Sequence, residues 1–490
     1  MGKSSSPTHV LELEILFDNK NPASVLEHLS NSAVSVYNAC LGEALKRMHL
    51  LVRDPEYNLL KKEYANAKKK GLPTKALSDR YQELFIKYSF TDFSLQHYAT
   101  IIRKHFPNFG SDEACKQATR AFNAVEKVRI GKAEKVRFRS KYEGTSFEGK
   151  SKNSKLHYDI DTRQLKYGKY SFNLRIKPND QYAMLCLLDT VKYVRVLKRV
   201  IRGKTRWFCQ LVLKGLPPDN QRHKTVYANE QGGIDPGVST MAFVSDTNAK
   251  LYELAPGCAE DEKLIRRLQR AMDRSKRATN PDNYNPNGTA KKGRRKWNYS
   301  KRYLRLKAKL KEAYRRCKVK REIAHHILAK KILAKASFLK TEEMSYQGLA
   351  KRSKKTTVNK KNGRINSKKR YGKTVHARAP ARLIAILDQK LSYIGRTVER
   401  INTRKVRASQ YNPLDGTYTK KDLRDRMVDL GENTVVQRDL LSAYCIKHTT
   451  ATNDSIDPRS AYDSFGTFKQ LNDREVERLH NTNTLCWYIR

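Results

Sequence analysis

The chain has 490 residues and carries 100 Lys and Arg against 49 Asp and Glu, a formal net charge of +51. A basic excess this large points to a polyanionic partner, because nucleic acid releases counterions when it is bound. We find no apolar run long enough to cross a membrane and expect no membrane partner. The eight cysteines form no C-x-x-C pair, which favours reduced thiols in the cores of a cytosolic protein.

The first half of the chain begins with a strand-like alternation of apolar and polar residues at 10–17 and then turns helical from 22 to about 127. Period-two alternation returns between 135 and 215, in the segments 136–139, 156–160, 170–174, 194–197 and 207–213. We therefore predict a small antiparallel β-barrel with a helical domain inserted after its first strand. The outer face of this barrel would be basic and rich in tyrosine, which suits RNA.

The second half alternates strands with helices. The pattern predicts short strands within 231–256, a helix over 298–335, a strand ending at Glu342, a helix over 380–401 and a helix that carries Asp439 and ends near Lys447. Turn formers interrupt the helical pattern at 280–288, and the polar, basic stretch 351–373 predicts a loop. The fold class predicted for the whole chain is a multidomain α+β protein.

Three carboxylates stand beside apolar sequence in a chain otherwise short of acids: Asp235, Glu342 and Asp439. Burying three carboxylates together is costly unless cations neutralise them. Two Mg²⁺ ions held by such carboxylates cleave phosphodiesters by in-line displacement. Acids on a first strand, a later strand and a late helix are the layout of a ribonuclease-H-like nuclease. Each acid alone has an ordinary alternative, which is a turn for Asp235, a helix N-terminus for Glu342 and a surface ion pair for Asp439.

Asp457 is an alternative to Asp439, because both begin the pattern Asp-x-x-Ser-Ala-Tyr. Asp457 precedes Pro458, and this pair is typical of an N-cap followed by proline at the first helical position. That structural interpretation is sufficient for Asp457, so we predict Asp439 as the third acid of the site.

The acid-bearing segments resemble the three RuvC motifs of the transposon-encoded TnpB proteins and their descendants, the type V CRISPR effectors. The segments are Gly233-Ile234-Asp235-Pro236-Gly237, the run Thr341 to Tyr346, and the run Gln437 to Tyr444; 146–150 and 280–292 are also similar to that family. The resemblance implies that Asp235, Glu342 and Asp439 are catalytic and bind two Mg²⁺ ions. It also implies a wedge barrel at 1–20 and 135–228, a recognition domain at 21–134, a RuvC nuclease domain at 229–408 and 435–490, and a target-nucleic-acid-binding insert at 409–434.

The insert departs from the family pattern. A zinc ribbon often stands at this place, whereas here Asn412, Asp415, Asp429 and Glu432 occupy the positions of its thiols. Zinc in structural sites prefers sulfur and nitrogen ligands, so we expect no structural zinc.

The function implied is RNA-guided, Mg²⁺-dependent cleavage of target DNA by a cytoplasmic, nucleoid-associated prokaryotic endonuclease. The guide would be either a transposon-end RNA or a CRISPR RNA, and the protein would read a short flanking motif in duplex DNA. Two alternatives remain. One is a guide-directed DNA-binding protein or repressor with little cleavage activity. The other is a basic RNA-binding or ribosome-associated protein, which explains the charge but not the buried acids.

Overall fold

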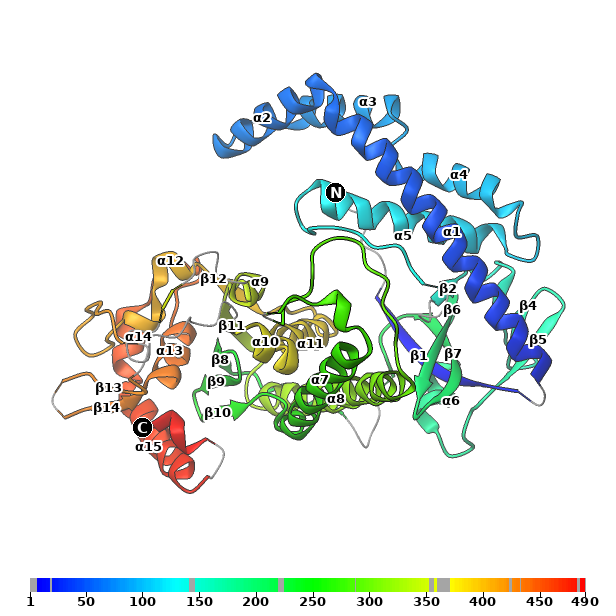
Figure 1. The fold of residues 1–490 in the computed structure, drawn as a ribbon. Helices are drawn as coiled ribbons and strands as arrows, with labels where there is room; N and C mark the ends of the chain where they lie inside the picture. The colour runs from blue at the N-terminus through cyan, green and yellow to red at the C-terminus, as the bar shows by residue number, and fades with distance from the viewer. Residues whose placement is uncertain are drawn as a thin grey trace. The chain divides into compact units, whose positions relative to one another are not determined.

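A computed structural model describes residues 7–17, 20–140, 146–218, 224–286, 288–351, 357–358, 371–422, 425–431, 433–482 and 485–489. The chain folds into two compact units, Met1–Arg222 and His223–Arg490 (Figure 1). Both helices and strands occur in each unit, so the protein has a mixed α and β fold.

The first unit contains a seven-stranded antiparallel sheet in the order β2-β6-β7-β1-β5-β4-β3. Its strands are β1 (Thr8–Leu16), β2 (Ser146–Glu148), β3 (Leu156–Asp159), β4 (Gln164–Tyr167), β5 (Tyr170–Leu174), β6 (Val191–Ile201) and β7 (Lys204–Lys214). Hydrogen bonds do not join the terminal strands β3 and β2 in the described part of the chain, although β3 lies close to β6. The sheet therefore does not show the closed barrel that the strand pattern predicts.

Five helices follow β1, and a short one precedes β6. They are α1 (Lys20–Arg53), α2 (Pro55–Lys69), α3 (Lys75–Lys87), α4 (Asp92–Arg103), α5 (Ser111–Arg129) and α6 (Gln181–Cys186). The helices and the sheet share one hydrophobic core, in which Leu41 of α1 and Ala118 of α5 are buried with Phe147 and Leu211. The helical insertion predicted from sequence therefore packs on the same core as the strands around it.

The alternating segment 136–139 is not a strand, contrary to our expectation. Its backbone pairs with a side chain of α1 instead. The amide of Arg139 donates to Asn38 Oδ1 at 2.8 Å, and Asn38 Nδ2 donates to the carbonyl oxygen of Arg139 at 2.9 Å. The Asn38 amide thus supplies both hydrogen bonds that a neighbouring strand would have supplied.

The second unit is built on a five-stranded mixed sheet in the order β10-β9-β8-β11-β12. Its strands are β8 (Gln231–Pro236), β9 (Thr240–Ser245), β10 (Ala249–Glu253), β11 (Phe338–Glu342) and β12 (Glu399–Ile401). The pairs β8–β11 and β11–β12 are parallel, while β9 pairs antiparallel with both β8 and β10. This confirms the strands predicted within 231–256 and the strand that ends at Glu342.

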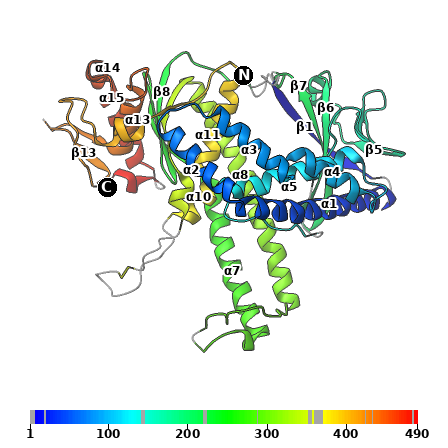
Figure 2. The same ribbon diagram turned by 90° about the horizontal axis from the view of Figure 1, so that it is seen from above.

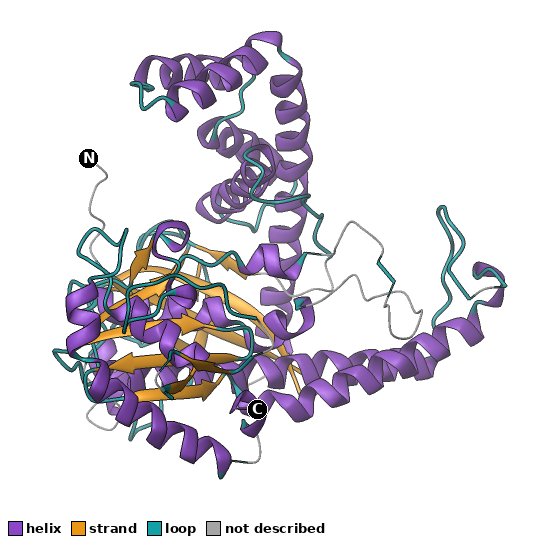
Figure 3. Ribbon diagram, turned by 90° about the vertical axis from the view of Figure 1, so that its left-hand side faces the viewer, coloured by secondary structure: helices purple, strands orange, loops and turns teal. Residues whose placement is uncertain are grey.

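Helices cover both faces of this sheet (Figure 3). On β9, Met241 and Phe243 face a core shared with α8 (Lys301–Leu333) and α11 (Pro380–Ser392). The alternate residues Ala242 and Val244 face a second core, shared with α13 (Arg438–Lys447) and α15 (Phe465–His480). The alternation follows from the period of two along a strand.

The helix predicted over 380–401 is shorter than expected. It ends at Ser392, after which Gly395 has a φ of +72°, in the left-handed region that favours glycine. The chain then forms β12, which extends the sheet beyond β11. Further helices of this unit are α7 (Ala259–Thr279), α9 (Tyr346–Ala350), α10 (Gly372–Arg378), α12 (Thr403–Val406) and α14 (Pro458–Asp463).

The helices α7 and α8 lie side by side and project from the sheet as a pair (Figure 2). Ile265 and Leu268 of α7 pack against Ala313 of α8. The remaining strands, β13 (Met427–Asp429) and β14 (Val435–Gln437), form an antiparallel hairpin directly before α13. Among the described residues, no helix is both long enough and apolar enough to cross a lipid bilayer.

Candidate active site

Two of the three acids lie side by side on neighbouring strands. The parallel register of β8 and β11 pairs Ile234 with Thr341, so Asp235 and Glu342 occupy the next position along each strand. Their side chains point to one face, because residues in register on adjacent strands share a face. That face is opposite to the one occupied by Ile234, which is fully buried against α8 and α11.

The helix α13 crosses the same face at close range. A Cβ atom added to Gly233 would lie 1.9 Å from the carbonyl oxygen of Ala443 and 2.6 Å from the amide nitrogen of Lys447. Only a residue without a side chain fits at this position. Gly233 is two residues before Asp235, and Ala443 is one helical turn after Asp439, so the contact brings the two aspartates toward each other.

The electrostatics of Asp235 report this clustering. Burial raises the pKa of Asp235 well above its ordinary value, and the negative charges of Asp439 and Glu342 raise it further. A hydrogen bond from the Ser442 side chain and the charge of Arg438 act in the opposite direction. Burial also raises the pKa of Glu342. The three acids predicted from sequence therefore lie close enough for the charges of two of them to raise the pKa of the third.

Tyr346, on the first turn of α9, lies close enough to the acids for their charges to affect its pKa. Burial raises the pKa of its hydroxyl, and Asp235 and Glu342 raise it further. In the part of the chain that the structure describes, this buried hydroxyl has no hydrogen-bond partner. Tyr346 therefore presents a free polar atom beside the acid pair.

Asp439 is held by an arginine next to it in the sequence. Arg438 donates to Asp439 Oδ1 from Nη2 at 3.0 Å and from Nε at 3.2 Å. Arg426 Nη1 lies 3.9 Å from Asp439 Oδ2. The other terminal nitrogen of Arg438 donates to the carbonyl oxygens of Asp422 and Asp425, at 3.3 and 3.2 Å. The segment before β13 thereby fixes the guanidinium that neutralises Asp439.

The donor set fits a hard divalent cation. Carboxylate oxygens are the ligands that Mg²⁺ prefers, and Asp235, Glu342 and Asp439 combine burial with mutual repulsion that such a cation relieves. In the described ranges, no three His, Cys, Asp or Glu side chains are close enough to form a complete ligand cluster. Asp439 is instead turned to Arg438, so holding a metal with all three acids requires this ion pair to open.

Asp457 lies apart from this group and caps a helix, as its sequence context predicts. Its carboxylate accepts from the amide of Ser460 at 3.2 Å, and Pro458 is the first residue of α14. The largest influences on the pKa of Asp235 include Asp439 and Glu342 but not Asp457.

The predicted insert at 409–434 contains two turns, each closed by a hydrogen bond to an aspartate oxygen. Asp415 Oδ1 accepts from the amide of Thr417 at 2.8 Å, and Asp429 Oδ1 accepts from the amide of Gly431 at 2.9 Å. Asn412 connects the two turns, because its Nδ2 donates to the carbonyl oxygen of Leu430 at 3.2 Å. Glu432 lies outside the described residues.

Sequence reasoning singled out the acids but missed their supports. Gly233 and Ser442 belong to the acid-bearing segments, yet nothing in the sequence shows that one admits a helix and the other bonds Asp235. The role of Arg438 could have been predicted, because it is a cation directly before Asp439 in the sequence. The exposed basic residues of α7 could not be told apart in sequence from the other basic residues of that helical stretch.

A scan against protein-family models finds no match, and neither does a search of curated proteins. Among solved structures, the chain is similar to a Cas12f1 protein from the cryo-EM structure of a Cas12f1–sgRNA–target DNA complex. This similarity has a TM-score of 0.48 and 11% sequence identity, and it covers 90% of this chain and 99% of that one. A CRISPR-Cas12f ternary complex gives a TM-score of 0.26 at 14% identity, over 88% of this chain and 82% of that one. Neither TM-score reaches 0.5.

Proposed function

We propose that this protein is an RNA-guided, Mg²⁺-dependent DNA endonuclease with a single RuvC-type site formed by Asp235, Glu342 and Asp439. The observation that carries the proposal is the pKa of Asp235, which Asp439 and Glu342 raise in addition to burial. A stable fold does not gain from placing three acids together in a partly buried site, so the cluster indicates a cation-dependent role.

The fold supports a ribonuclease-H-like nuclease domain. The strand order of its sheet is β10-β9-β8-β11-β12. Strand β9 runs antiparallel to β8 and β10, whereas β8, β11 and β12 run parallel to one another. Asp235 and Glu342 lie at the carboxyl ends of two adjacent parallel strands, where side chains converge on a ligand. The helix with the third acid crosses the same face.

The residues divide the chemistry among them. Bound Mg²⁺ would stabilise the attacking and leaving oxygens of an in-line phosphodiester displacement. Asp235 and Asp439 would hold the metal, Ser442 orients Asp235, and Glu342 orients the attacking water by accepting its hydrogen bonds. Arg438 neutralises Asp439 through its hydrogen bond, and this ion pair would have to open for Asp439 to hold the metal.

The partners proposed are a guide RNA and a target DNA. The net charge of +51 supports a polyanionic partner, and the three RuvC-like motifs support the guide-dependent class of nuclease. The guide is either a transposon-end RNA or a CRISPR RNA. Sequencing the RNA that co-purifies with the chain identifies which.

The test is cleavage by Asp235→Asn protein, loaded with that RNA, on a matching DNA in Mg²⁺. We expect cleavage to be lost and guide and target binding to be kept, because the substitution removes the metal-binding charge and keeps the shape. Asp457→Asn is the matched control and should cut at the rate of the unchanged protein. Cutting by Asp235→Asn would contradict the site, and absence of cutting by the unchanged protein would favour a guide-directed binder.

A further inference from the structure

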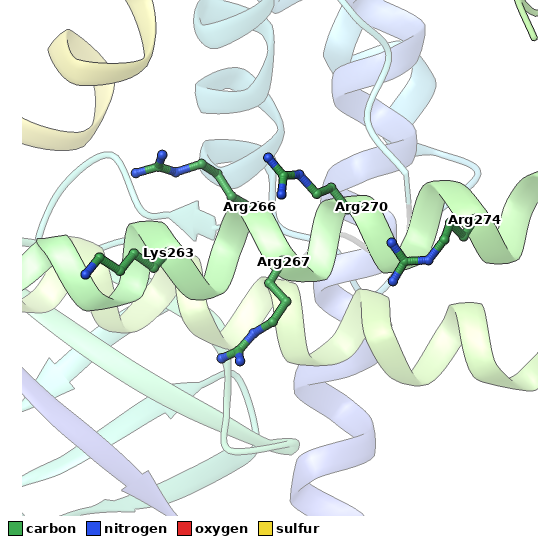
Figure 4. Close-up of a pocket in the computed structure, with 5 residues that line it drawn as sticks. All are labelled: Lys263, Arg266, Arg267, Arg270 and Arg274. Atoms are coloured by element: carbon green, nitrogen blue, oxygen red, sulfur yellow. The ribbon is translucent and has the colours of Figure 1, made fainter.

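One side of α7 carries five exposed basic residues that line a shallow groove of about 350 Å³. They are Lys263, Arg266, Arg267, Arg270 and Arg274. Four-residue steps separate Arg266, Arg270 and Arg274, so they form a row along the helix, while Arg267 points away from Arg266 and Arg270 (Figure 4). We call these five residues the α7 basic strip.

Almost no acid neutralises the α7 basic strip. Among the described residues, its one ion pair joins Arg266 to Glu262 at 4.0 Å, and Asp273 bonds Arg277 rather than Arg274. None of the groove-lining residues that the structure describes is acidic. Unpaired like charges repel one another, so a row of arginines with this little compensation costs stability unless a ligand binds it.

The opposite side of α7 explains why the strip faces outward. Ile265 and Leu268 are buried against α8 and fix the rotation of the helix. The row of arginines is therefore held in one orientation along a supported helix rather than scattered over a loop. Guanidinium groups in such a row bind successive phosphates, because each one forms two parallel hydrogen bonds to phosphate oxygens.

Positive charge continues beyond the strip to the end of the α7–α8 pair. Lys292, Arg294, Arg295 and Lys296 are exposed there. Their segment is ordered by contacts with the end of α7. Lys276 lies 3.5 Å from the centre of the Trp297 ring, and Arg277 Nη1 donates to the carbonyl oxygen of Gly288 at 2.6 Å. The strip is thus one part of a longer cationic surface on the helix pair.

We propose that the α7 basic strip binds the phosphate backbone of an RNA duplex. Four residues of α-helix rise about 6 Å, which is close to the separation of successive phosphates in an A-form strand and shorter than that in B-form DNA. Duplex RNA is recognised through its backbone and shape rather than through its base edges. The strip offers cations in register with such a backbone and no group that reads bases.

This inference deepens the proposed function, since a folded guide RNA contains duplex segments, but its test does not require cleavage. The probe is a short RNA duplex of arbitrary sequence, compared with a DNA duplex of the same sequence, with a chelator present. The variant is the full chain with Arg266→Gln, Arg270→Gln and Arg274→Gln. The control is Lys307→Gln, Lys311→Gln and Lys318→Gln, which removes the same charge from exposed positions of α8.

We expect the strip variant to bind the RNA duplex about tenfold more weakly at low salt. Its slope of log affinity against log salt should fall by about 2 to 3, one unit for each lost phosphate contact. The control variant should change affinity less than about twofold, since its residues lie outside the groove. Replacing the three arginines by lysine should keep the salt slope but lower the affinity. Lysine retains the positive charge but cannot form the two parallel hydrogen bonds of a guanidinium group.

Three results would overturn the inference. Unchanged RNA affinity in the strip variant would show that the strip is not a binding surface. An equal loss of affinity for the DNA duplex in the strip variant would contradict the assignment to RNA. An equal loss of RNA affinity in the control variant would show that only the net charge matters. Each leaves the nuclease proposal standing, while a cleaving Asp235→Asn protein would leave this inference standing.

Discussion

Gly233 of β8 packs directly against Ala443 of α13. A Cβ on Gly233 would lie 1.9 Å from the Ala443 carbonyl oxygen, which is less than any van der Waals contact. Gly233 belongs to β8 and Ala443 belongs to α13, so neither backbone can move unless its whole strand or helix moves. This contact determines how near Asp439 comes to Asp235.

Gly233→Ala should therefore damage both stability and activity. The added methyl group pushes α13 away from β8 and separates the acids that the helix and the strand carry. We expect the free energy of unfolding to fall by about 2 kcal/mol or more, as for overpacked cores, together with loss of cleavage. Thermal melting and a cleavage assay measure the two effects.

Gly466→Ala is the matched control, because Gly466 is in α15 and, apart from its own helix and neighbours, no described atom lies within 4 Å of its added Cβ. It should be neutral or stabilise by up to about 1 kcal/mol. A Gly233→Ala protein as stable and active as Gly466→Ala would show that α13 does not depend on this contact.

The three acids could be predicted from the sequence because burying a carboxylate is costly. An acid beside apolar sequence can therefore be recognised without knowing which residues contact it in the fold. The sequence did not predict the approach at Gly233, since a glycine says nothing about which element will pack against it. The segment 136–139 alternated like a strand, yet its hydrogen-bond partner is the Asn38 side chain. The helix predicted to 401 stops early because Gly395 takes a positive φ, which the apolar pattern does not reveal.

Arg438→Ala should strengthen metal binding. Removing the guanidinium frees Asp439 and leaves the negative charge of the site less compensated. We expect a larger rise in melting temperature on adding Mg²⁺ or Mn²⁺ than in the unchanged protein, because the ion stabilises the folded state that binds it. Arg459→Ala, at an exposed ion pair of α14, is the control. An equal metal response in both variants would mean that Asp439 does not hold the metal.

The insert should be stable without zinc, because Asn412 connects its turns through hydrogen bonds. Asn412→Ala leaves the Leu430 carbonyl oxygen without this donor and should lower stability by about 1 to 3 kcal/mol. Elemental analysis should find no zinc in the unchanged protein, and a zinc chelator should leave its melting temperature constant. One tightly held zinc per chain would contradict this account of the insert.

His448 should make the protein acid-sensitive. Burial, and after it the charge of Lys447, lowers the pKa of His448 to about 4, while the ring pairs with Ser460 and Ser464. The unfolded chain therefore binds the proton more readily than the folded one between about pH 6.5 and pH 4. The stabilisation is complete above about pH 6.5 and falls by about 1.4 kcal/mol per unit as the pH drops through this window.

Denaturant unfolding at several pH values measures this dependence. His448→Asn should be less stable at neutral pH and should lose much of the slope between pH 6.5 and pH 4. His480→Asn, at an exposed position, should keep the slope. An unchanged slope in His448→Asn would show that other groups cause the acid sensitivity.

Asp439 and Asp457 begin the same six-residue pattern, and substitutions at the two positions should have different effects. Asp439→Asn should abolish cleavage even at high Mg²⁺, since it keeps the shape and removes the charge that neutralises the cation. Asp457→Asn should cost little, because asparagine caps a helix about as well as aspartate, and Asp457→Ala should lower stability by about 1 kcal/mol without altering cleavage. The cleavage rate and the melting temperature of all three variants, measured with one guide and one target, decide between the two positions. A folded but inactive Asp457→Asn protein beside an active Asp439→Asn protein would assign the third metal ligand to Asp457, the N-cap of α14.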